Sequence, residues 1–327
     1  MGLARFAIRK VSAAMLTIFV IICVNFIIFR IVPGDPVRMM FRDPRVGAEK
    51  IQEMYRKFGL SGSLGEQFGA YLRELFLRGD LGFSFARRAP VLEVIVERIP
   101  QTLMLILTAL IIAVILGTML GALAGWRTGT KFDSIIITVS LAFYSIPTFI
   151  MGIIMLVIFG LMLGLFPMSG MSTIGADLTG WAHVKDVLWH MFLPVGAIVV
   201  WYIGEYIIVT RNSMQDVLDQ DYIISARAKG IKESAILRRH ALRNAILPVV
   251  TITGVNVAFA VGGVIEAETV FNWPGVGRLL YDSVMGRDYP VLQGLFLIFA
   301  VALVVANLVV DLIYGYIDPR IKVGGGQ

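Results

Sequence analysis

The strongest constraint in this sequence is the length of its uncharged segments. No charged residue occurs between Asp133 and Asp177, and the segment 101–125 carries no charge at all. A helix needs about 20 mostly apolar residues to cross the hydrocarbon core of a bilayer. Only 16% of the 327 residues are charged and 57% are hydrophobic, so the chain lacks the charged shell of a soluble protein. The sequence therefore predicts an all-α, polytopic membrane protein.

Six windows are long and apolar enough to be membrane spans. The uncharged segment after Asp133 is too long for one straight span, and Pro147 and the sequence FPMSG at 166–170 offer a kink and an exit. Charged residues separate the other windows. We expect six transmembrane helices at 11–31, 101–125, 134–165 with a kink at Pro147, 188–210, 246–265 and 290–314.

The distribution of Lys and Arg orients these spans. An even number of spans places both termini on one side, and if that side is the cytoplasm the short inner segments hold fourteen Lys and Arg residues against three in the short outer loops. The positive-inside bias is counted over such short loops. We therefore expect both termini in the cytoplasm. The expected cytoplasmic segments are 1–10, 126–133, 211–245 and 315–327, and the expected extracytoplasmic segments are 32–100, 166–187 and 266–289.

The long outer segment 32–100 has helical patterning of its own. The sequences EKIQEMYRKFGL (49–60) and EQFGAYLRELFLRGDLG (66–82) carry apolar residues at helical spacing. We expect a small, partly helical cap, which is either a pair of helices lying on the membrane surface or a docking surface. A cleavable signal peptide is not expected, because the first apolar run is too long and lacks a small-residue cleavage site.

The second window contains Gly117, Gly121 and Gly125 at four-residue spacing. Glycines at this spacing give a helix one smooth face and allow another helix to approach closely. We therefore predict a tight helix contact along this face.

Ionisable residues are absent from the middle of every predicted span. Acidic residues lie only near the span ends, where they can reach the interface: Glu205, Glu266, Glu268 and Asp311. An ion-coupled carrier, by contrast, is expected to bury carboxylates at the midplane. The residues we predict to line a translocation path are Tyr144, Asn256 and Glu266.

Enzymatic, metal-binding and nucleic-acid-binding functions find little support. The sequence has no HExxH or GxSxG motif, and the dipeptide Gly-Lys, which a Walker A motif requires, never occurs. One cysteine and three scattered histidines provide no metal-ligand spacing. The net charge of +6 arises from basic residues beside apolar spans, which are topology signals. We predict no catalytic residue, metal site or cofactor, no nucleic-acid partner, and lipid around the spans; if ATP drives the protein, another chain binds it.

One polar, basic segment interrupts the apolar chain. The sequence SARAKGIKESAILRRHALRNAILP (225–248) carries six Lys or Arg residues between the fourth and fifth windows. Good helix formers lead up to Gly230, which fits a helix end, and helical patterning then resumes. Pro248 removes a backbone donor at the start of the fifth window. The segment is a solvated loop, an amphipathic helix on anionic lipid, or a rigid cytoplasmic knob for another protein, and its small Ala and Ser residues suit the knob best.

This segment resembles the EAA loop of the permease subunits of binding-protein-dependent ABC transporters. Ile224-Ser225-Ala226 stands where that loop usually reads Glu-Ala-Ala, and the interval from Gly230 to Pro248 is long, as in the dipeptide/oligopeptide/nickel branch. The long outer segment is similar to the first, B-type, permease of such systems. Six further motifs, in chain order, agree with this branch: RIVPGDP, GDLGFSF, RIPQTL, VFNWPGVGRLL, RDYPVLQG and NLVVDLIYGYIDPRI.

The resemblance implies a permease subunit in the inner membrane of a prokaryote, which forms half of a translocation pathway for dipeptides or oligopeptides. Its implied partners are a second permease subunit, two ATP-binding cassette ATPase subunits and an extracytoplasmic substrate-binding protein. Nickel or another small solute is the alternative substrate within the family; an ion-coupled secondary transporter and a membrane scaffold are the alternatives outside it. The residues that the resemblance assigns to coupling with the ATPases are Ser225, Ala226, Arg227, Lys229, Gly230, Ile231, Lys232 and Glu233.

Overall fold

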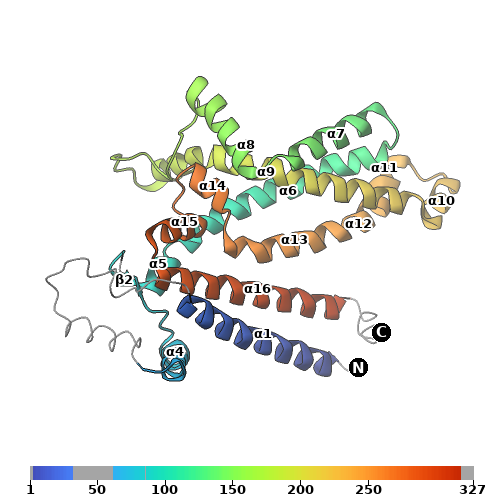
Figure 1. Cartoon of the computed structure of the whole chain (residues 1–327). Helices are drawn as coiled ribbons and strands as arrows, with labels where there is room; N and C mark the ends of the chain where they lie inside the picture. The colour runs from blue at the N-terminus through green and yellow to red at the C-terminus, as the bar shows by residue number, and fades with distance from the viewer. Residues whose placement is uncertain (1–2, 32–61, 85, 318–327) are drawn as a thin grey trace. The chain divides into compact units, whose positions relative to one another are not determined.

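The computed structural model describes residues 3–31, 62–84 and 86–317, which are mostly helical (Figure 1). They divide into two compact units, unit 1 formed by 1–100 and 278–327 and unit 2 by 101–277. The first elements of the chain are α1 (Leu3–Ile31), α4 (Leu64–Arg78), β1 (Phe83–Ser84), β2 (Ala89–Pro90), α5 (Val91–Val96), α6 (Ile99–Trp126), α7 (Lys131–Ser145), α8 (Thr148–Met155) and the π-helical η1 (Leu156–Met162). The later elements are α9 (Gly180–Leu218), α10 (Asp221–Ala228), α11 (Glu233–Ala235), the π-helical η2 (Ile236–Ala241), α12 (Leu242–Ala245), α13 (Leu247–Phe259), the 3-10 turn η3 (Ala260–Gly262), α14 (Ile265–Val270), α15 (Val276–Gly286) and α16 (Tyr289–Ile317).

In unit 1 the first and last long helices, α1 and α16, pack against each other (Figure 1). Asn25 of α1 donates a hydrogen bond from Nδ2 to the backbone oxygen of Gln293, 3.0 Å away. Phe29 and Phe296 meet with their ring centroids 6.0 Å apart. A buried amide that donates to a backbone carbonyl satisfies part of its hydrogen-bonding capacity in an apolar setting, so it fixes the register of this pair.

Helix α4 forms part of the predicted outer cap, and its sequence explains both of its ends. Ser63 accepts a hydrogen bond from the amide of Glu66, whose side chain accepts one from the amide of Ser63, and Gly79 closes the helix with φ of 63°. This reciprocal capping satisfies amides that the first helical turn leaves free, and glycine adopts the left-handed conformation without strain. The other predicted helix of this cap, at 49–60, lies outside the described residues.

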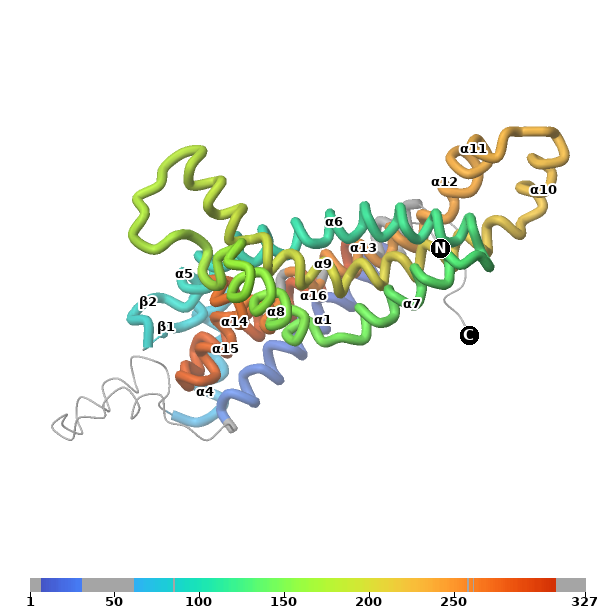
Figure 2. The backbone as a smooth tube through the Cα atoms, turned by 90° about the horizontal axis from the view of Figure 1, so that it is seen from above, coloured from blue at the N-terminus to red at the C-terminus, as the bar shows by residue number. Residues whose placement is uncertain are grey.

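Unit 2 is built around α9, a helix of 39 residues that contacts α7, α8, α12 and α13. Figure 2 shows α6 and α9 running side by side, with α10, α11 and α12 at one end of the pair. A core cluster between α6, α9 and α14 includes Leu105, Ile198, Ala267 and the fully buried Trp273. This packing of long apolar helices gives unit 2 a continuous interior.

Four helical segments within the described part of the chain are long and apolar enough to cross a membrane, and each overlaps a predicted span. They are Ala7–Arg30, Val91–Trp126, Gly180–Leu218 and Tyr289–Val309. A fifth arises if the bent pair Lys131–Ser145 and Thr148–Met162 counts as one span; its two parts meet at 99°. The break falls at Pro147, where the sequence predicts a kink, because a proline ring disfavours a helical conformation of the residue before it.

The predicted fifth span, at 246–265, is a shorter helix in the structure. Helix α13 has 13 residues, which gives about 20 Å of helix where a hydrocarbon core is about 30 Å thick. The helix ends in η3 and Gly263, whose φ is 77°. A Cβ atom at Gly263 would lie 2.9 Å from the backbone nitrogen of Gly277, so the chain turns there to let two backbone segments meet. Apolar composition alone does not reveal such a close backbone approach.

Candidate coupling and translocation sites

The glycines of α6 form the close helix contact that their spacing predicts. A Cβ atom at Gly117 would lie 2.5 Å from the Cβ of Tyr206, and one at Gly121 would lie 2.6 Å from the backbone oxygen of Ile207. At Gly125 the distance to the Cβ of Met214 would be 2.7 Å. No side chain fits at these positions without moving a helix, so α6 and α9 are held together by shape over several turns.

Most of the predicted knob (225–248) lies in a run of short helices that follows α9 and consists of α10, α11, η2 and α12, which we call the coupling segment (221–245). Helix α10 ends at Ala228, and Gly230 follows with φ of 70°. The amide of Ile231 then donates to the backbone oxygen of Ala226 at 3.3 Å. A left-handed residue after the last helical turn allows the chain to turn back and satisfy a terminal carbonyl, which is why glycine is favoured here.

The coupling segment has a core of its own that continues into the long helices. Ile223, Ala226 and Ile236 are buried together with Ala122 of α6 and Met214 of α9. Small alanines at the contact bring the short helices close to the ends of α6 and α9. The segment is therefore packed as one piece with these two helices, which is the property a force-transmitting knob needs.

This packing corrects one part of the sequence interpretation. The sequence predicts Ala226 in a docking surface of small residues, but only 6% of it is exposed. Residues three positions apart share a face of a helix, so Ala226 follows Ile223 into the core. Arg227 is also engaged within the chain, because its Nε lies 3.2 Å from a carboxylate oxygen of Glu233 and its guanidinium lies over the ring of Trp126.

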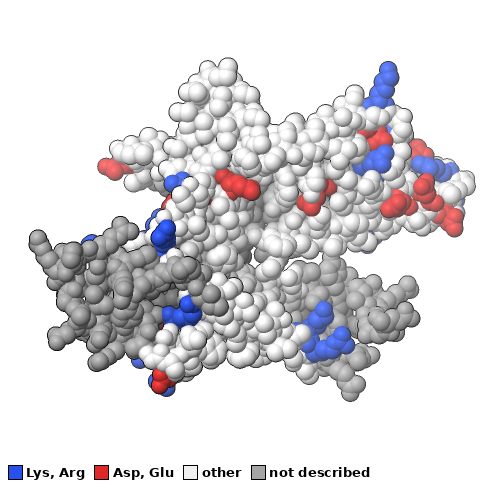
Figure 3. Space-filling view, viewed as in Figure 1, with Lys and Arg blue, Asp and Glu red and all other residues white. Residues whose placement is uncertain are grey.

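The remaining predicted coupling residues lie on the outside of the segment. They are Ser225, Lys229, Gly230, Ile231, Lys232 and Glu233, all exposed. Ile224, the first residue of the Ile224-Ser225-Ala226 triplet, and Tyr222 are exposed beside them, at 56% and 42%; neither is among the predicted coupling residues. Figure 3 shows charged side chains gathered over the α10–α11 end. Exposed apolar side chains ringed by charges are typical of a surface that binds another protein.

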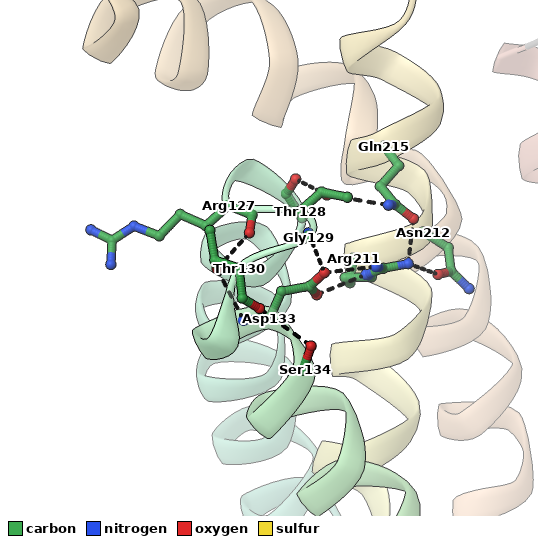
Figure 4. A network of polar contacts seen from close by, with 10 residues as sticks. Arg127, Thr128, Gly129, Thr130, Asp133, Ser134, Arg211, Asn212 and Gln215 are labelled. Carbon is green, nitrogen blue, oxygen red and sulfur yellow. Dashed lines mark hydrogen bonds and ion pairs between the residues drawn. The ribbon is translucent and has the colours of Figure 1, made fainter.

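A polar network beside the coupling segment ties α9 to α7 (Figure 4). The guanidinium of Arg211 donates to both carboxylate oxygens of Asp133, from Nε at 3.0 Å and from Nη2 at 2.8 Å. Asp133 also accepts from the amide of Gly129 at 3.0 Å, and its side chain is only 5% exposed. Two parallel charge-assisted hydrogen bonds fix both the distance and the orientation of the two helices.

The same arginine connects the network to the loop between α6 and α7. Arg211 Nη1 donates to the side-chain oxygen of Gln215, and the amide nitrogen of Gln215 donates to the hydroxyl of Thr128 at 3.2 Å. In the sequence alone, Arg211 and Asp133 indicate only topology. The two residues are 78 positions apart in the sequence, and no local pattern connects residues at that distance.

The three predicted path residues gather around one stretch of α9. The ring of Tyr144 stacks on that of Trp201 with centroids 5.4 Å apart. Asn256 donates from Nδ2 to a carboxylate oxygen of Glu205 at 3.0 Å, one helical turn after Trp201. Glu266 lines a pocket together with Trp201. The structure thus brings Tyr144, Asn256 and Glu266 to adjoining positions, although 122 residues of sequence (266 − 144) separate the first from the last.

Glu268 is a buried acidic residue, although its sequence position near a span end predicts contact with water. It is 0% exposed, and the hydroxyl of Thr102 donates to its Oε1 at 2.8 Å. The same hydroxyl accepts from the amide of Val276 at 2.7 Å, and a Cβ atom at Gly275 would overlap the Glu268 carboxylate. The motifs RIPQTL and VFNWPGVG therefore meet around one carboxylate, which explains the glycines of the second motif.

These features are those of a mostly helical membrane protein in which a group of short helices packs at one end of two long ones. Family comparisons match residues 117–323 to the "binding-protein-dependent transport system inner membrane component" and residues 3–106 to its N-terminal component. The chain belongs to this family of ABC transporter permeases. Membership makes a substrate-binding protein and ATPase subunits its partners, and it places the chain in the membrane as a multi-pass protein.

Individual relatives resemble the chain over almost its full length. The oligopeptide transport system permease protein AppB of Bacillus subtilis is 36% identical over 98% of this chain and 100% of its own length. The di/tripeptide transport system permease protein DppB of Pseudomonas aeruginosa is 36% identical over 97% and 98%. The glutathione transport system permease protein GsiC of Escherichia coli is 37% identical over the same shares.

Proposed function

We propose that this chain is one of two permease subunits of an importer for dipeptides or oligopeptides. The observation that carries the proposal is the likeness, over nearly the full chain, to permeases whose names specify short peptides. In this scheme the second permease subunit supplies the other half of the pathway, two ATPases supply the energy, and an extracytoplasmic binding protein delivers the peptide. Nickel, the alternative cargo within the family, is not favoured by these relatives.

In this proposal the coupling segment receives the movement of an ATPase. The exposed residues from Ser225 to Glu233 enter a cleft of the ATPase, with Ile224 and Ile231 as apolar contacts. Because Ile223 and Ala226 pack against α6 and α9, a displacement of the segment moves both long helices. The Asp133–Arg211 pair carries the same movement to α7. Closely packed helices respond to such a displacement as rigid bodies rather than by deforming.

The proposed topology keeps six membrane passages with both termini in the cytoplasm. It is supported by the excess of Lys and Arg in the inner segments. The shorter α13 then crosses together with the turn η3 and α14, and α4 stands on the extracytoplasmic side, where the binding protein docks. Labelling of single cysteines introduced at position 229 and in α4 tests this topology, because a membrane-impermeant reagent should reach only the second from outside the cell.

Uptake by a reconstituted complex tests the function. The chain is produced with its genomic partners, inserted into proteoliposomes and supplied with the binding protein, radiolabelled dialanine or nickel, and ATP. We expect ATP-dependent accumulation of the peptide that persists when ion gradients are collapsed. Accumulation of nickel alone would replace the peptide by the metal ion as cargo, and uptake driven by an ion gradient without ATP would overturn the proposal.

A further inference from the structure

A pocket in unit 2 adjoins the predicted path residues and is unlike the apolar surfaces around it. It has a volume of about 270 Å³ and lies where the start of α8, the middle of α9 and the start of α14 meet. Its lining residues are Thr148, Ile198, Trp201, Tyr202, Gly263, Val264, Ile265 and Glu266. It therefore combines aromatic, aliphatic and acidic side chains around one small volume.

The charged side chain that lines this pocket is acidic. Glu266 is the one charged residue of its lining, is exposed, and forms no ion pair with any residue that the structure describes. Glu205 lies one turn beyond Trp201 on α9, and no Lys or Arg occurs at 187–210 or 244–277. Glu266 lies directly after the predicted fifth span, exposed and without a cation among the described residues, so its carboxylate is open to a cationic ligand.

The aromatic wall of the pocket is held in a fixed orientation. Tyr144 stacks on Trp201 with 22° between the ring planes, and Tyr202 meets Trp201 edge-on at 4.9 Å. Because two rings hold Trp201, its orientation is fixed before a ligand binds, and binding does not have to order this side chain. Aromatic faces attract ammonium groups, and the attraction is stronger where water is excluded.

We propose that this pocket binds the primary ammonium group of the transported substrate, with Glu266 as its counter-ion and Trp201 and Tyr202 as its aromatic wall. The assignment rests on the proposed function, under which this ammonium is the free amino terminus of a peptide. Ile198, Val264 and Ile265 provide an apolar surface for the first side chain. The pocket thereby selects for an unblocked amino terminus and leaves the sequence of the peptide open.

Direct binding to the purified transporter, without the binding protein, tests this assignment. Equilibrium dialysis with radiolabelled dialanine and with N-acetyl-dialanine is carried out on the wild-type complex and on Glu266→Gln and Trp201→Leu. We expect Glu266→Gln to weaken dialanine binding about tenfold, the effect of losing one charge-assisted contact, and to leave the acetylated peptide within about twofold. Trp201→Phe should retain most of the affinity that Trp201→Leu loses. Glu93→Gln, an exposed glutamate of α5, is the matched control.

The outcomes separate this inference from the proposed function. Three results would overturn the assignment of the pocket. Glu266→Gln could weaken the binding of both peptides equally, it could weaken the binding of neither, or dialanine could fail to bind the wild-type complex. The proposed function is tested separately by ATP-driven uptake of dialanine when the binding protein is present. If dialanine is taken up but Glu266→Gln does not distinguish dialanine from N-acetyl-dialanine, the protein is still a peptide importer and the pocket does not bind the amino terminus.

Discussion

The two ends of helix α6 are fixed in opposite ways. Near its start, Thr102 is part of a dry polar cluster that contains the fully buried Glu268 and the backbone of Val276. Near its end, Gly121, Gly125 and Ala122 pack by shape against α9 and the coupling segment, and the Asp133–Arg211 ion pair lies beside this contact. Buried hydrogen bonds are directional and costly to break, whereas small-residue contacts depend only on fit. The start of α6 is thus held by buried hydrogen bonds, and its end by close packing of small residues.

Under the proposed function, this difference suits a helix that an ATPase displaces at one end. A contact held by shape passes on a displacement without breaking hydrogen bonds, and the polar cluster at the opposite end holds its position. The stability of the two ends should therefore respond to different substitutions. The shape contact should be sensitive to added side-chain volume, and the polar cluster to the loss of a single hydroxyl.

The largest expected effect comes from adding volume at the shape contact. Gly121→Leu places a side chain where even a Cβ would lie 2.6 Å from the oxygen of Ile207, so α6 and α9 must separate. Gly121→Ala should cost about 1–3 kcal/mol of stability, and Gly121→Leu should prevent recovery of an assembled complex. Gly69→Ala in α4, where nothing lies within 4 Å, is the control. Thermal unfolding and size-exclusion profiles in detergent measure both, and a well-assembled Gly121→Leu complex would contradict the close contact.

At the polar end, removal of one hydroxyl should have the next largest effect. Thr102→Val deletes the group that donates to Glu268 and accepts from Val276, and leaves both partners buried. Unsatisfied buried groups cost about 1–3 kcal/mol. Thr102→Ser keeps the hydroxyl and should stay close to wild type. Thermal stability in detergent distinguishes the two variants, and a Thr102→Val complex as stable as the wild type and Thr102→Ser would remove the hydrogen bonds from the comparison.

Much of this contrast could be predicted from the sequence, and the parts that could not have physical reasons. The glycines at 117, 121 and 125 follow the helical period, so their spacing predicts the contact directly. Gly230 predicts the end of α10 because positive φ favours glycine. Arg211 with Asp133 and Thr102 with Glu268 pair across 78 and 166 residues, and such distant pairs leave no periodic signal.

The sequence also does not predict the burial of Ala226 and Glu268. In both cases the residue type or its position is compatible with more than one environment. Alanine is compatible with a docking face and with a core, so at position 226 only the neighbouring buried Ile223 decides between them. Acidic residues near span ends usually reach water, which makes an interfacial position the natural expectation for Glu268. Its burial depends on the glycines of a motif seven to nine residues later, which leave room for the carboxylate (275 − 268 and 277 − 268).

The ion pair at the rim of the shape contact should contribute less than the buried hydroxyl. A double-mutant cycle with Arg211→Gln and Asp133→Asn isolates its coupling energy, which we expect at about 1–2 kcal/mol because the pair is bidentate and mostly shielded. The exposed pair Arg78–Glu74, at 3.1 Å in α4, is the control and should give below about 0.5 kcal/mol. Chemical denaturation in mixed micelles measures both cycles, and equal coupling energies would show that Arg211 and Asp133 form only a surface contact.

The smallest change in stability should carry the most specific loss of function. Gly230 has φ of 70°, and a Cβ atom there would have no neighbour within 4 Å, so Gly230→Ala adds only backbone strain, of about 1 kcal/mol. Gly79→Ala imposes the same strain at φ of 63°, also in open space, at the end of α4. The two variants should therefore lose similar stability in thermal unfolding. If the turn at Gly230 sets the shape of the knob, only Gly230→Ala lowers the peptide taken up per ATP hydrolysed, and Gly230→Asn, which tolerates positive φ, restores part of it. A similar transport ratio for Gly230→Ala and Gly79→Ala would mean that the coupling surface tolerates a distorted turn, and that shape governs the α6–α9 contact but not the docking of the ATPase.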